Sequence, residues 1–391
     1  MTASPLARRT ALSATAATVL ALSLPSTARA AESLRSRREA TPRFAYVGCY
    51  TTEQRNGHGK GISVFRADAP GRWRQLAVTA TLPNPSFLAL DHTRSHLYAV
   101  HGDLDQVSAF AIDEDTGLLT ALGSQSSRGG NPVHLAVSPD NRQLLVANYA
   151  TGTLAVLRRT AGGRLQPAHQ VIELTGTPGP DRTQQTGPHP HHIPFTPDGR
   201  HVLVPDKGTD LVHGFAYAPR TGRLSATTPP TNTVRSGAGP RHIRFHPRLP
   251  VAYVVDELNS QVTTYDFDAS SGGLVPRSWL PTLPPSFTGN STAAEIQLTP
   301  DARFLYVSNR GHDSVVGFRA DAAGSLHTLG WTPTGGAQPR FITVDPTGST
   351  LHVANQASDT ITAFHIGGDG SLQRIGRPVA TGSPVCIVFR P

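Results

Sequence analysis

The sequence predicts an all-β fold, a seven-bladed β-propeller with four-stranded blades. Three observations lead to this prediction. Charged residues make up 16% of the 391 residues, whereas Gly (37) and Pro (33) are abundant, which suits short strands joined by turns. A unit of two apolar strands joined by a Pro-Asp-Gly-type turn recurs along the chain. In one copy of this unit, the first strand is found at the C-terminus and the remaining strands near the N-terminus.

The repeat is visible in segments such as NPVHLAVSPDNRQLLVAN (131–148) and TAAEIQLTPDARFLYVSN (292–309). A third strand and a more variable fourth strand follow each copy. The first residue of the turn, used here as an anchor, recurs every 45 to 58 residues. The anchors, which number blades 1 to 7, are Asp91, Ser138, Thr196, His246, Thr299, Asp345 and Arg390. A period of this size with four strands predicts a propeller.

The seventh copy, SPVCIVFRP, ends after its first strand. FAYVGCYT, GISVFRAD and RWRQLAVTA near the N-terminus supply the other three. One blade is therefore shared by the two termini, which closes the ring and leaves no free sheet edge. We expect a single propeller domain over residues 44–391.

Apolar columns support this register, because residues two apart on a strand share a face. The positions three before the anchors are Leu88, Leu135, Ile193, Ile243, Ile296, Ile342 and Ile387. The positions one before are Leu90, Val137, Phe195, Phe245, Leu298, Val344 and Phe389. We interpret both columns as core between neighbouring blades.

The N-terminus resembles a cleaved export signal over residues 1–30, with Arg8 and Arg9 before an apolar stretch and a small-residue cleavage pattern. The paired arginines are similar to those of a twin-arginine signal. We expect a disordered linker over 31–43 and a secreted or extracytoplasmic monomer without a membrane span. The net charge is +8, but no basic run with interleaved aromatics suggests nucleic-acid binding.

Positions at the start of strand one and the end of strand two should meet at one mouth of the central channel. Blades 3 to 6 place charge there, whereas blades 1, 2 and 7 carry Phe, Tyr, Gly and Cys. The candidates are His191, His192, Lys207, Arg241, His242, Glu257, Glu295, Arg310 and Arg340, with Gln356 at the equivalent place on blade 6. Such a mixture can bind an anionic substrate and shift the pKa of a base. A merely solvated channel mouth is the alternative.

We expect no metal and no cofactor. Histidines one or two apart on a strand do not point together, and Arg241 and Arg340 would oppose a cation. A nucleophilic serine is also not expected, because no Gly-x-Ser-x-Gly turn is present.

Cys49 ends strand two of the shared blade and Cys386 begins its strand one. Antiparallel pairing would bring them close, so a disulfide that staples the closure is one expectation for an exported protein. Two free buried thiols are the other.

The segments YVGCYT, GPHPHHIPFTPDGRHVLVPDKG, GPRHIRFHP and AAEIQLTPDARFLYVSNRG resemble the seven-bladed lactonase family. That family includes the propeller type of 6-phosphogluconolactonase and the carboxy-muconate lactonizing enzymes, and the resemblance covers nearly the whole mature chain. It implies pocket residues at His192 or His191, Arg241, Glu257 and Arg310. Glu295 and Arg340 also match the pattern, whereas Cys49 stands where the family has Thr.

The first hypothesis is an exported hydrolase of a sugar-derived or carboxylated lactone. Arg241, Arg310 and Arg340 would hold the substrate and the oxyanion, and His192 or Glu257 would activate water. His191, Lys207, His242, Glu295 and Gln356 would bind substrate. A cycloisomerase of the carboxy-muconate type and a non-catalytic extracellular binding module are the rival hypotheses.

Overall fold

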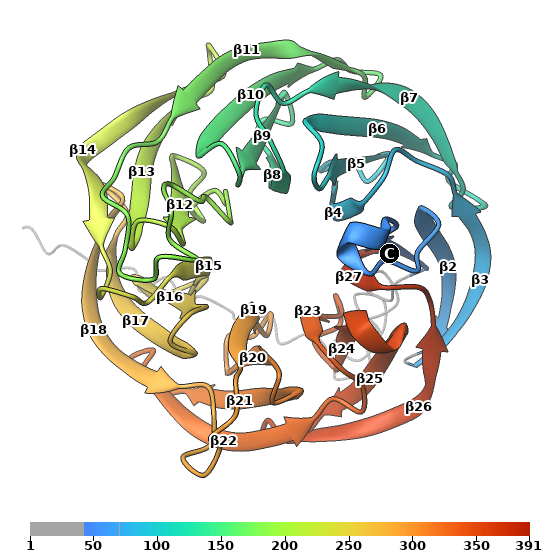
Figure 1. Ribbon diagram of the computed structural model, residues 1–391. Helices are drawn as coiled ribbons and strands as arrows, with labels where there is room; N and C mark the ends of the chain where they lie inside the picture. Colours follow the sequence, from blue (N-terminus) through green and yellow to red (C-terminus); the bar gives the residue numbers. More distant parts are fainter. Residues whose placement is uncertain (1–42, 70) are drawn as a thin grey trace, which may run out of the picture. The chain divides into compact units, whose positions relative to one another are not determined.

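The computed structural model describes residues 43–69 and 71–391, which form a ring of seven antiparallel β-sheets around a central channel (Figure 1). The prediction of a seven-bladed, all-β propeller is confirmed. The predicted export signal (1–30) and nearly all of the predicted linker (31–43) lie outside the described residues. In the described part of the chain, no helix is long and apolar enough to cross a membrane.

Each blade except blade 3 contributes one strand to each of four concentric positions. The innermost strands are β4 (Pro85–Leu90), β8 (Pro132–Val137), β15 (Pro240–Phe245), β19 (Thr292–Leu298), β23 (Pro339–Val344) and β27 (Pro384–Arg390). The second strands are β1 (Phe44–Cys49), β5 (His96–His101), β9 (Gln143–Asn148), β12 (His201–Asp206), β16 (Val251–Asp256), β20 (Phe304–Arg310) and β24 (Thr350–Asn355).

The third strands are β2 (Ile62–Ala69), β6 (Gln106–Ile112), β10 (Thr153–Arg159), β13 (Leu211–Ala218), β17 (Gln261–Asp268), β21 (Ser314–Ala320) and β25 (Thr360–Ile366). The outermost are β3 (Arg72–Thr79), β7 (Leu119–Ser126), β11 (Leu165–Glu173), β14 (Arg223–Thr233), β18 (Gly273–Pro281), β22 (Leu326–Pro333) and β26 (Leu372–Ala380). Two short 3-10 helices, η1 (Glu53–Arg55) and η2 (Gln356–Ser358), follow β1 and β24.

Blade 3 departs from the prediction of four regular strands. Its sheet holds β12, β13 and β14, and the innermost segment makes only isolated bridges, Pro190 to Asp206 and Phe195 to Val202. The reason is proline, which has no N–H to donate to a ladder. Pro190 and Pro194 lie in the inner segment, and Pro205 lies in β12 beside it. The histidines of this segment therefore lie on an irregular backbone.

The apolar columns form the contacts between blades. All seven residues three before the anchors are buried, with Ile193, Ile296 and Ile342 fully excluded from solvent. Most of the residues one before the anchors are partly buried against the same clusters. The interpretation of these positions as core is confirmed.

The ring closes through blade 7, whose strand order is β27-β1-β2-β3. Phe44 pairs with Arg390 and Val47 with Ile387 across the two ends of the chain. This is the predicted sharing of one blade by both termini.

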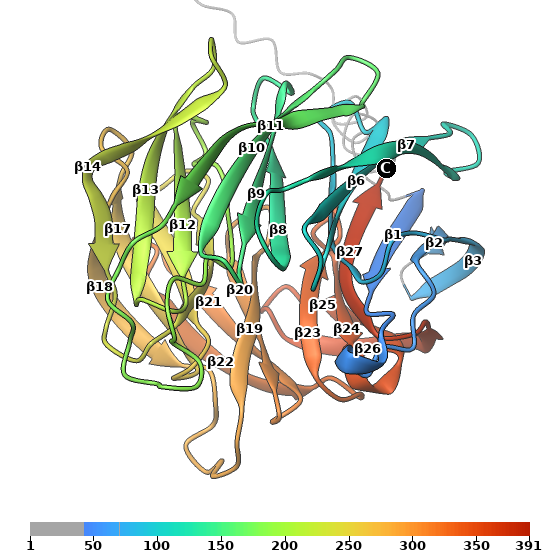
Figure 2. The same cartoon turned by 45° about the horizontal axis from the view of Figure 1, so that its top comes forward.

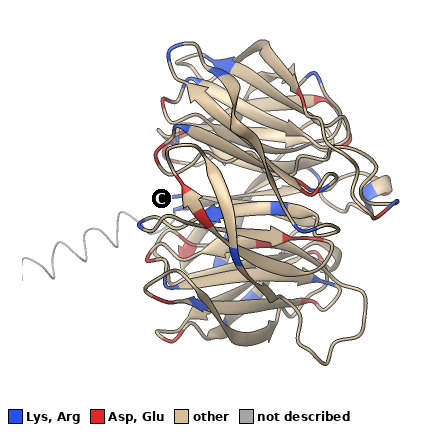
Figure 3. Ribbon diagram, turned by 90° about the vertical axis from the view of Figure 1, so that its left-hand side faces the viewer, with Lys and Arg blue, Asp and Glu red and all other residues tan. Residues whose placement is uncertain are grey.

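The loops that surround one mouth of the channel lie on one face of the ring. Figure 2 shows the loop before β12, the loop before β19 and η1 gathered on that face. Around the outside, basic and acidic residues are interspersed in the view of Figure 3 rather than collected in a patch of one sign.

Candidate functional site

One carboxylate and three cationic side chains meet where the inner strands of blades 3 to 5 begin. Oε1 of Glu257 lies 3.2 Å from Nζ of Lys207 and 3.2 Å from Nη2 of Arg310. Its Oε2 lies 3.1 Å from Nε of Arg241. Lys207 follows β12, Glu257 follows β16 and Arg310 ends β20, so three equivalent strand ends supply three of the four charges. We call these four residues the mouth cluster.

A β-bulge directs Arg241 into this cluster. In β15, Pro240 pairs with Asp256 and His242 with Val255, so Arg241 is an extra residue without a partner opposite. A bulge re-aims a side chain relative to the regular alternation of a strand. Arg241 and His242 therefore both turn toward the channel, and Nη1 of Arg241 donates to the carbonyl of Ala294 at 2.5 Å.

The mouth cluster keeps Glu257 ionised. Burial on its own raises the pKa of this carboxyl, but Arg310, Lys207 and Arg241 outweigh burial and hold it well below its usual value. Glu257 is therefore a fixed negative charge that holds three cations at the mouth.

His191 is the histidine beside the mouth cluster. Burial, followed by the positive charge of Arg241, lowers its pKa well below the usual value, so the imidazole is neutral at neutral pH. Its ring centroid lies 5.6 Å from that of Tyr149. Among the described residues its buried Nδ1 has no hydrogen-bond partner.

His192 lies deeper in the channel than His191 and connects blade 3 to blade 4. Its Nδ1 accepts the backbone N–H of Ile243 at 3.2 Å, and its ring stacks on His242 at 4.4 Å. His134 makes the same bond one blade earlier, accepting the N–H of Ile193 at 3.3 Å. The recurrence of histidine at this position thus has a structural reason, the fastening of neighbouring inner strands.

A second ionic group lies below the mouth cluster. Glu295 is 1% exposed, with Oε1 at 3.0 Å from Nη2 of Arg244 and Oε2 at 2.9 Å from Nδ1 of His242. Arg241 connects the two groups, because its Nη1 lies 4.0 Å from Glu295 Oε2. Burial raises the pKa of Glu295, and Arg244 and Arg241 counter this effect only in part.

Arg244 is a residue that the sequence reasoning missed. It lies two before its anchor and therefore on the same face as His242. The equivalent positions in the other blades are Ala89, Ala136, Pro194, Gln297, Thr343 and Val388. Arg244 is the one charged residue at this position in the seven blades, so comparing the positions two before the anchors would have identified it as a candidate.

The residues four before the anchors close the channel beneath the mouth. The ring of Phe87 on blade 1 lies 4.1 Å from His134, 6.0 Å from Phe341 and 6.5 Å from His242, so it reaches across to blade 4. This layer separates the mouth cluster from a cavity of about 430 Å³ on the other side, which Arg244 and apolar residues line.

Two further predicted residues lie at the rim. The guanidinium of Arg340 lies over the ring of Tyr50, 5.6 Å from its centroid. Gln356 begins η2, and in the described part of the chain its side chain bonds to none of the other candidate residues. Arg340 likewise forms no ion pair or hydrogen bond with another candidate in the described part of the chain, so both residues lie outside the mouth cluster.

The expectation of a disulfide between Cys49 and Cys386 is wrong. Both thiols are free and buried. Cys386 pairs with Gly48 across the two strands, and Cys49 is the next residue along, so the two side chains do not face each other. Cys49 Sγ instead donates to the carbonyl of Gly61 at 2.9 Å, and Cys386 Sγ accepts the N–H of Leu88 at 3.3 Å.

Within residues 43–69 and 71–391, no group of three or more His, Cys, Asp or Glu side chains is arranged to hold a metal ion. The mouth cluster instead collects cations around one carboxylate.

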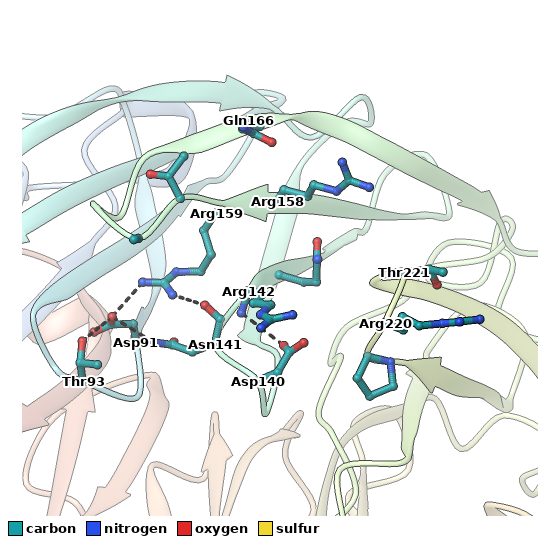
Figure 4. Close-up of a pocket in the computed structure, with 14 residues that line it drawn as sticks. Asp91, Thr93, Asp140, Asn141, Arg142, Arg158, Arg159, Gln166, Arg220 and Thr221 are labelled. Carbon is teal, nitrogen blue, oxygen red and sulfur yellow. Dashed lines mark hydrogen bonds and ion pairs between the residues drawn. The ribbon is translucent and has the colours of Figure 1, made fainter.

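A cavity of about 670 Å³ lies at the opposite ends of the strands, around the anchor turns of blades 1 and 2 (Figure 4). Its central feature is the ion pair of Arg159 Nη2 with Asp91 Oδ2 at 2.8 Å, with Thr93 bonded to the same carboxylate. These partners neutralise each other. No histidine lines this cavity, so it offers no neutral base.

Comparison with known proteins assigns the chain to a family. The family model described as a seven-bladed β-propeller lactonase matches residues 44–389. The 6-phosphogluconolactonase of Bacillus subtilis is 34% identical over 304 residues, covering 77% of this chain and 84% of that protein. That of Pectobacterium carotovorum is 33% identical over 282 residues, covering 71% and 80%. The structure of the periplasmic gluconolactonase of Pseudomonas aeruginosa superposes with a TM-score of 0.82 at 31% identity, covering 88% of this chain and 98% of that one. The resemblance seen in the sequence is thereby confirmed, and this chain belongs to the seven-bladed β-propeller lactonase family.

Proposed function

We propose that this protein is an extracytoplasmic lactonase that hydrolyses a sugar-derived or carboxylated lactone at the mouth cluster. The observation that carries the proposal is Glu257 with Lys207, Arg241 and Arg310 within 3.2 Å, beside a neutral imidazole. The relatives named 6-phosphogluconolactonase and gluconolactonase support this class of substrate.

In the proposed reaction His191 is the general base. It takes a proton from water as the water oxygen attacks the lactone carbonyl. The guanidinium groups of Arg241 and Arg310 stabilise the oxyanion that forms. The ring C–O bond then breaks, the ring oxygen leaves as an alcohol with the proton from His191, and the carboxylic acid product releases a proton to solvent.

This assignment differs from the expectation that His192 or Glu257 activates water. Nδ1 of His192 is occupied by the backbone of Ile243, and both carboxylate oxygens of Glu257 are engaged by cations. His191 has a free ring nitrogen and lies at the mouth. Glu257 then acts by holding the cations in position.

Charge at the mouth favours an acidic substrate. Lys207, Arg241 and Arg310 surround the single carboxylate of Glu257 and Arg340 lies at the rim, which leaves an excess of positive charge. A carboxylate or phosphate on the substrate would balance it.

Export is proposed from residues 1–30 and from the periplasmic location in the name of the Pseudomonas relative. Replacing Arg8 and Arg9 by Lys should retain the protein in the cytoplasm, as cell fractionation would measure. Unchanged export in that variant would contradict a twin-arginine route.

A pH-stat screen of sugar and aliphatic lactones tests the activity, because hydrolysis releases one proton per lactone. We expect catalysed proton release above the spontaneous rate for at least one acidic or polyol lactone, and its loss in His191→Ala. A screen without any catalysed release would overturn the proposal.

The excess of positive charge also fits a cycloisomerase that acts on a dicarboxylate. Ring opening without water yields an unsaturated acid, which ultraviolet absorbance detects, whereas hydrolysis yields a hydroxy acid. A non-catalytic binding module would show saturable binding in calorimetry and no turnover in either assay.

A further inference from the structure

A second hollow opens on the same face of the ring as the mouth cluster. It has a volume of about 550 Å³ and belongs to blades 7 and 1, the sector without the charged candidates. Its lining is Thr52, Gln54, Arg55, Pro83, Asn84, Gly102, Asp103 and Leu104. These residues follow the second strands or precede the first strands, as the mouth cluster does in blades 3 to 5.

Gly102 is one of the residues that line the hollow. It is the equivalent on blade 1 of Lys207, Glu257 and Arg310, whose side chains fill the mouth on their own blades. A Cβ at Gly102 would come within 3.2 Å of Ser86 Oγ. Ser86 does not line the hollow, so a side chain at Gly102 would first meet a residue beside it.

The hollow adjoins the charged sector of the ring through Tyr50. The guanidinium of Arg55, which lines the hollow, lies 5.4 Å from the centroid of the Tyr50 ring. The guanidinium of Arg340, from the charged sector, lies 5.6 Å from the same centroid. One aromatic ring thus contacts a residue of each sector.

The hollow is held rigid by a hydrogen-bond network. Asn84, which is fully buried, accepts the backbone N–H of Thr51 at 2.8 Å and donates to Asp103 Oδ2 at 3.0 Å. Arg55 binds Asp103 through both Nε, at 2.8 Å, and Nη2. Among the described residues, none bonds the remaining terminal nitrogen of Arg55. The polar groups are therefore fixed before any ligand arrives.

The chemistry of this lining suits a neutral polyol. Arg55 and Asp103 neutralise each other, so the hollow does not select for charge. Guanidinium, carboxylate, amide and hydroxyl groups together offer donors and acceptors to neighbouring hydroxyls of a sugar ring. The volume lies within the range of about 300–1,000 Å³ typical of small-molecule pockets.

We propose that this hollow is a subsite for a neutral sugar ring attached to the lactone, so that the substrate is a glycosylated aldonolactone rather than a monosaccharide lactone. The proposal rests on the lactonase function proposed above. The lactone ring lies at the mouth cluster, and its glycosyl substituent reaches past Tyr50 to Arg55 and Asp103.

The test compares kcat/KM for cellobiono-1,5-lactone and glucono-1,5-lactone in the wild-type protein and in Arg55→Ala. We expect the wild type to prefer the disaccharide lactone by about tenfold or more, the effect of one or two good hydrogen bonds. Arg55→Ala should lower the ratio of the two kcat/KM values about tenfold. Asp103→Ala, which removes the carboxylate that positions Arg55, should lower the same ratio.

Arg277→Ala is the matched control, because Arg277 forms a similarly exposed ion pair with Asp266 on the outer strands of blade 4. It should leave both activities unchanged. Equal kcat/KM values for the two lactones in the wild type, or an unchanged ratio in both hollow variants, would overturn the subsite.

If the protein hydrolyses neither lactone, the result counts against the proposed function. The subsite is then tested by calorimetry with the ring-opened acids, cellobionate and gluconate. Tighter binding of cellobionate than gluconate, lost in Arg55→Ala, supports the subsite without the activity. Equal binding of the two acids refutes it.

Discussion

Arg241 joins the two ionic groups of the channel, and its pairing with Glu257 is the contact on which the mouth depends. Nε of Arg241 lies 3.1 Å from Oε2 of Glu257, while Nη1 is held by the carbonyl of Ala294. Both residues are buried, so the pair is weakly screened by salt. Arg241 thus has a fixed position toward the mouth and toward Glu295 below it.

Replacing Glu257 with Gln should reduce kcat/KM for a responsive lactone by about 100-fold or more, since the cations lose the charge that positions them. The measurement is initial rate in a pH-stat. Glu114→Gln, an exposed carboxylate on blade 1, is the control and should have normal activity. Wild-type kinetics in Glu257→Gln would show that the mouth cluster is not the catalytic site.

Replacing Arg244 with Met should destabilise the fold by about 3 kcal/mol, because the buried Glu295 would lose its ion pair with Arg244. The pKa of Glu295 is already raised by burial and would rise further. A carboxyl with a raised folded pKa stabilises the fold at low pH and loses that contribution as pH rises, so the loss should be larger at pH 8 than at pH 5. Urea unfolding at both pH values measures it, with the exposed Arg303→Met as control. An equal loss at both pH values would contradict the role assigned to Glu295.

Replacing Asp256 with Asn should stabilise the protein above neutral pH. Burial raises the pKa of Asp256 to about 7, whereas its unfolded value is about 4. The wild type therefore loses stability as pH rises from about 4 to 7, and between pH 5 and 8 the loss is about 2–3 kcal/mol. Asn occupies the equivalent position in three other blades, Asn148, Asn309 and Asn355. A chemical unfolding series over pH should show a smaller decline in the variant, and an identical decline would refute the shifted pKa.

Replacing His352 with Leu should make the protein more resistant to acid. Burial lowers the pKa of His352 to about 3, and the unfolded value is about 6.5. Because the unfolded chain binds the proton first, stability falls as pH drops from about 7 toward 3. The variant should lack about 2 kcal/mol of the decline between pH 7 and 5. His327→Leu, on an exposed side chain, should keep the full decline, and parallel curves for His352→Leu and wild type would be the contrary result.

The thiols of Cys49 and Cys386 should be unreactive in the folded protein. Burial raises the pKa of each thiol, so neither is accessible or ionised at neutral pH. A thiol reagent should label neither in native buffer and both in denaturant, without prior reduction. Labelling in denaturant only after reduction would reveal a disulfide.

The repeat determined most of the fold in advance. Equivalent positions follow from counting along a periodic sequence, and this is why the blade number, the shared blade 7 and the apolar columns could be predicted. The same counting placed Lys207, Glu257 and Arg310 at three equivalent strand ends, and the structure brings them within ion-pair distance.

Only the tertiary structure determined the directions of the side chains and their contacts between blades. A bulge turns Arg241 toward the mouth, and prolines break the inner strand of blade 3, so that His191 faces the mouth while His192 is fixed to the next blade. A one-residue offset in pairing separates Cys49 from Cys386. Spacing alone determined which positions are equivalent, but the direction of each side chain depends on local backbone irregularity and on partners from other blades, which only the assembled ring supplies.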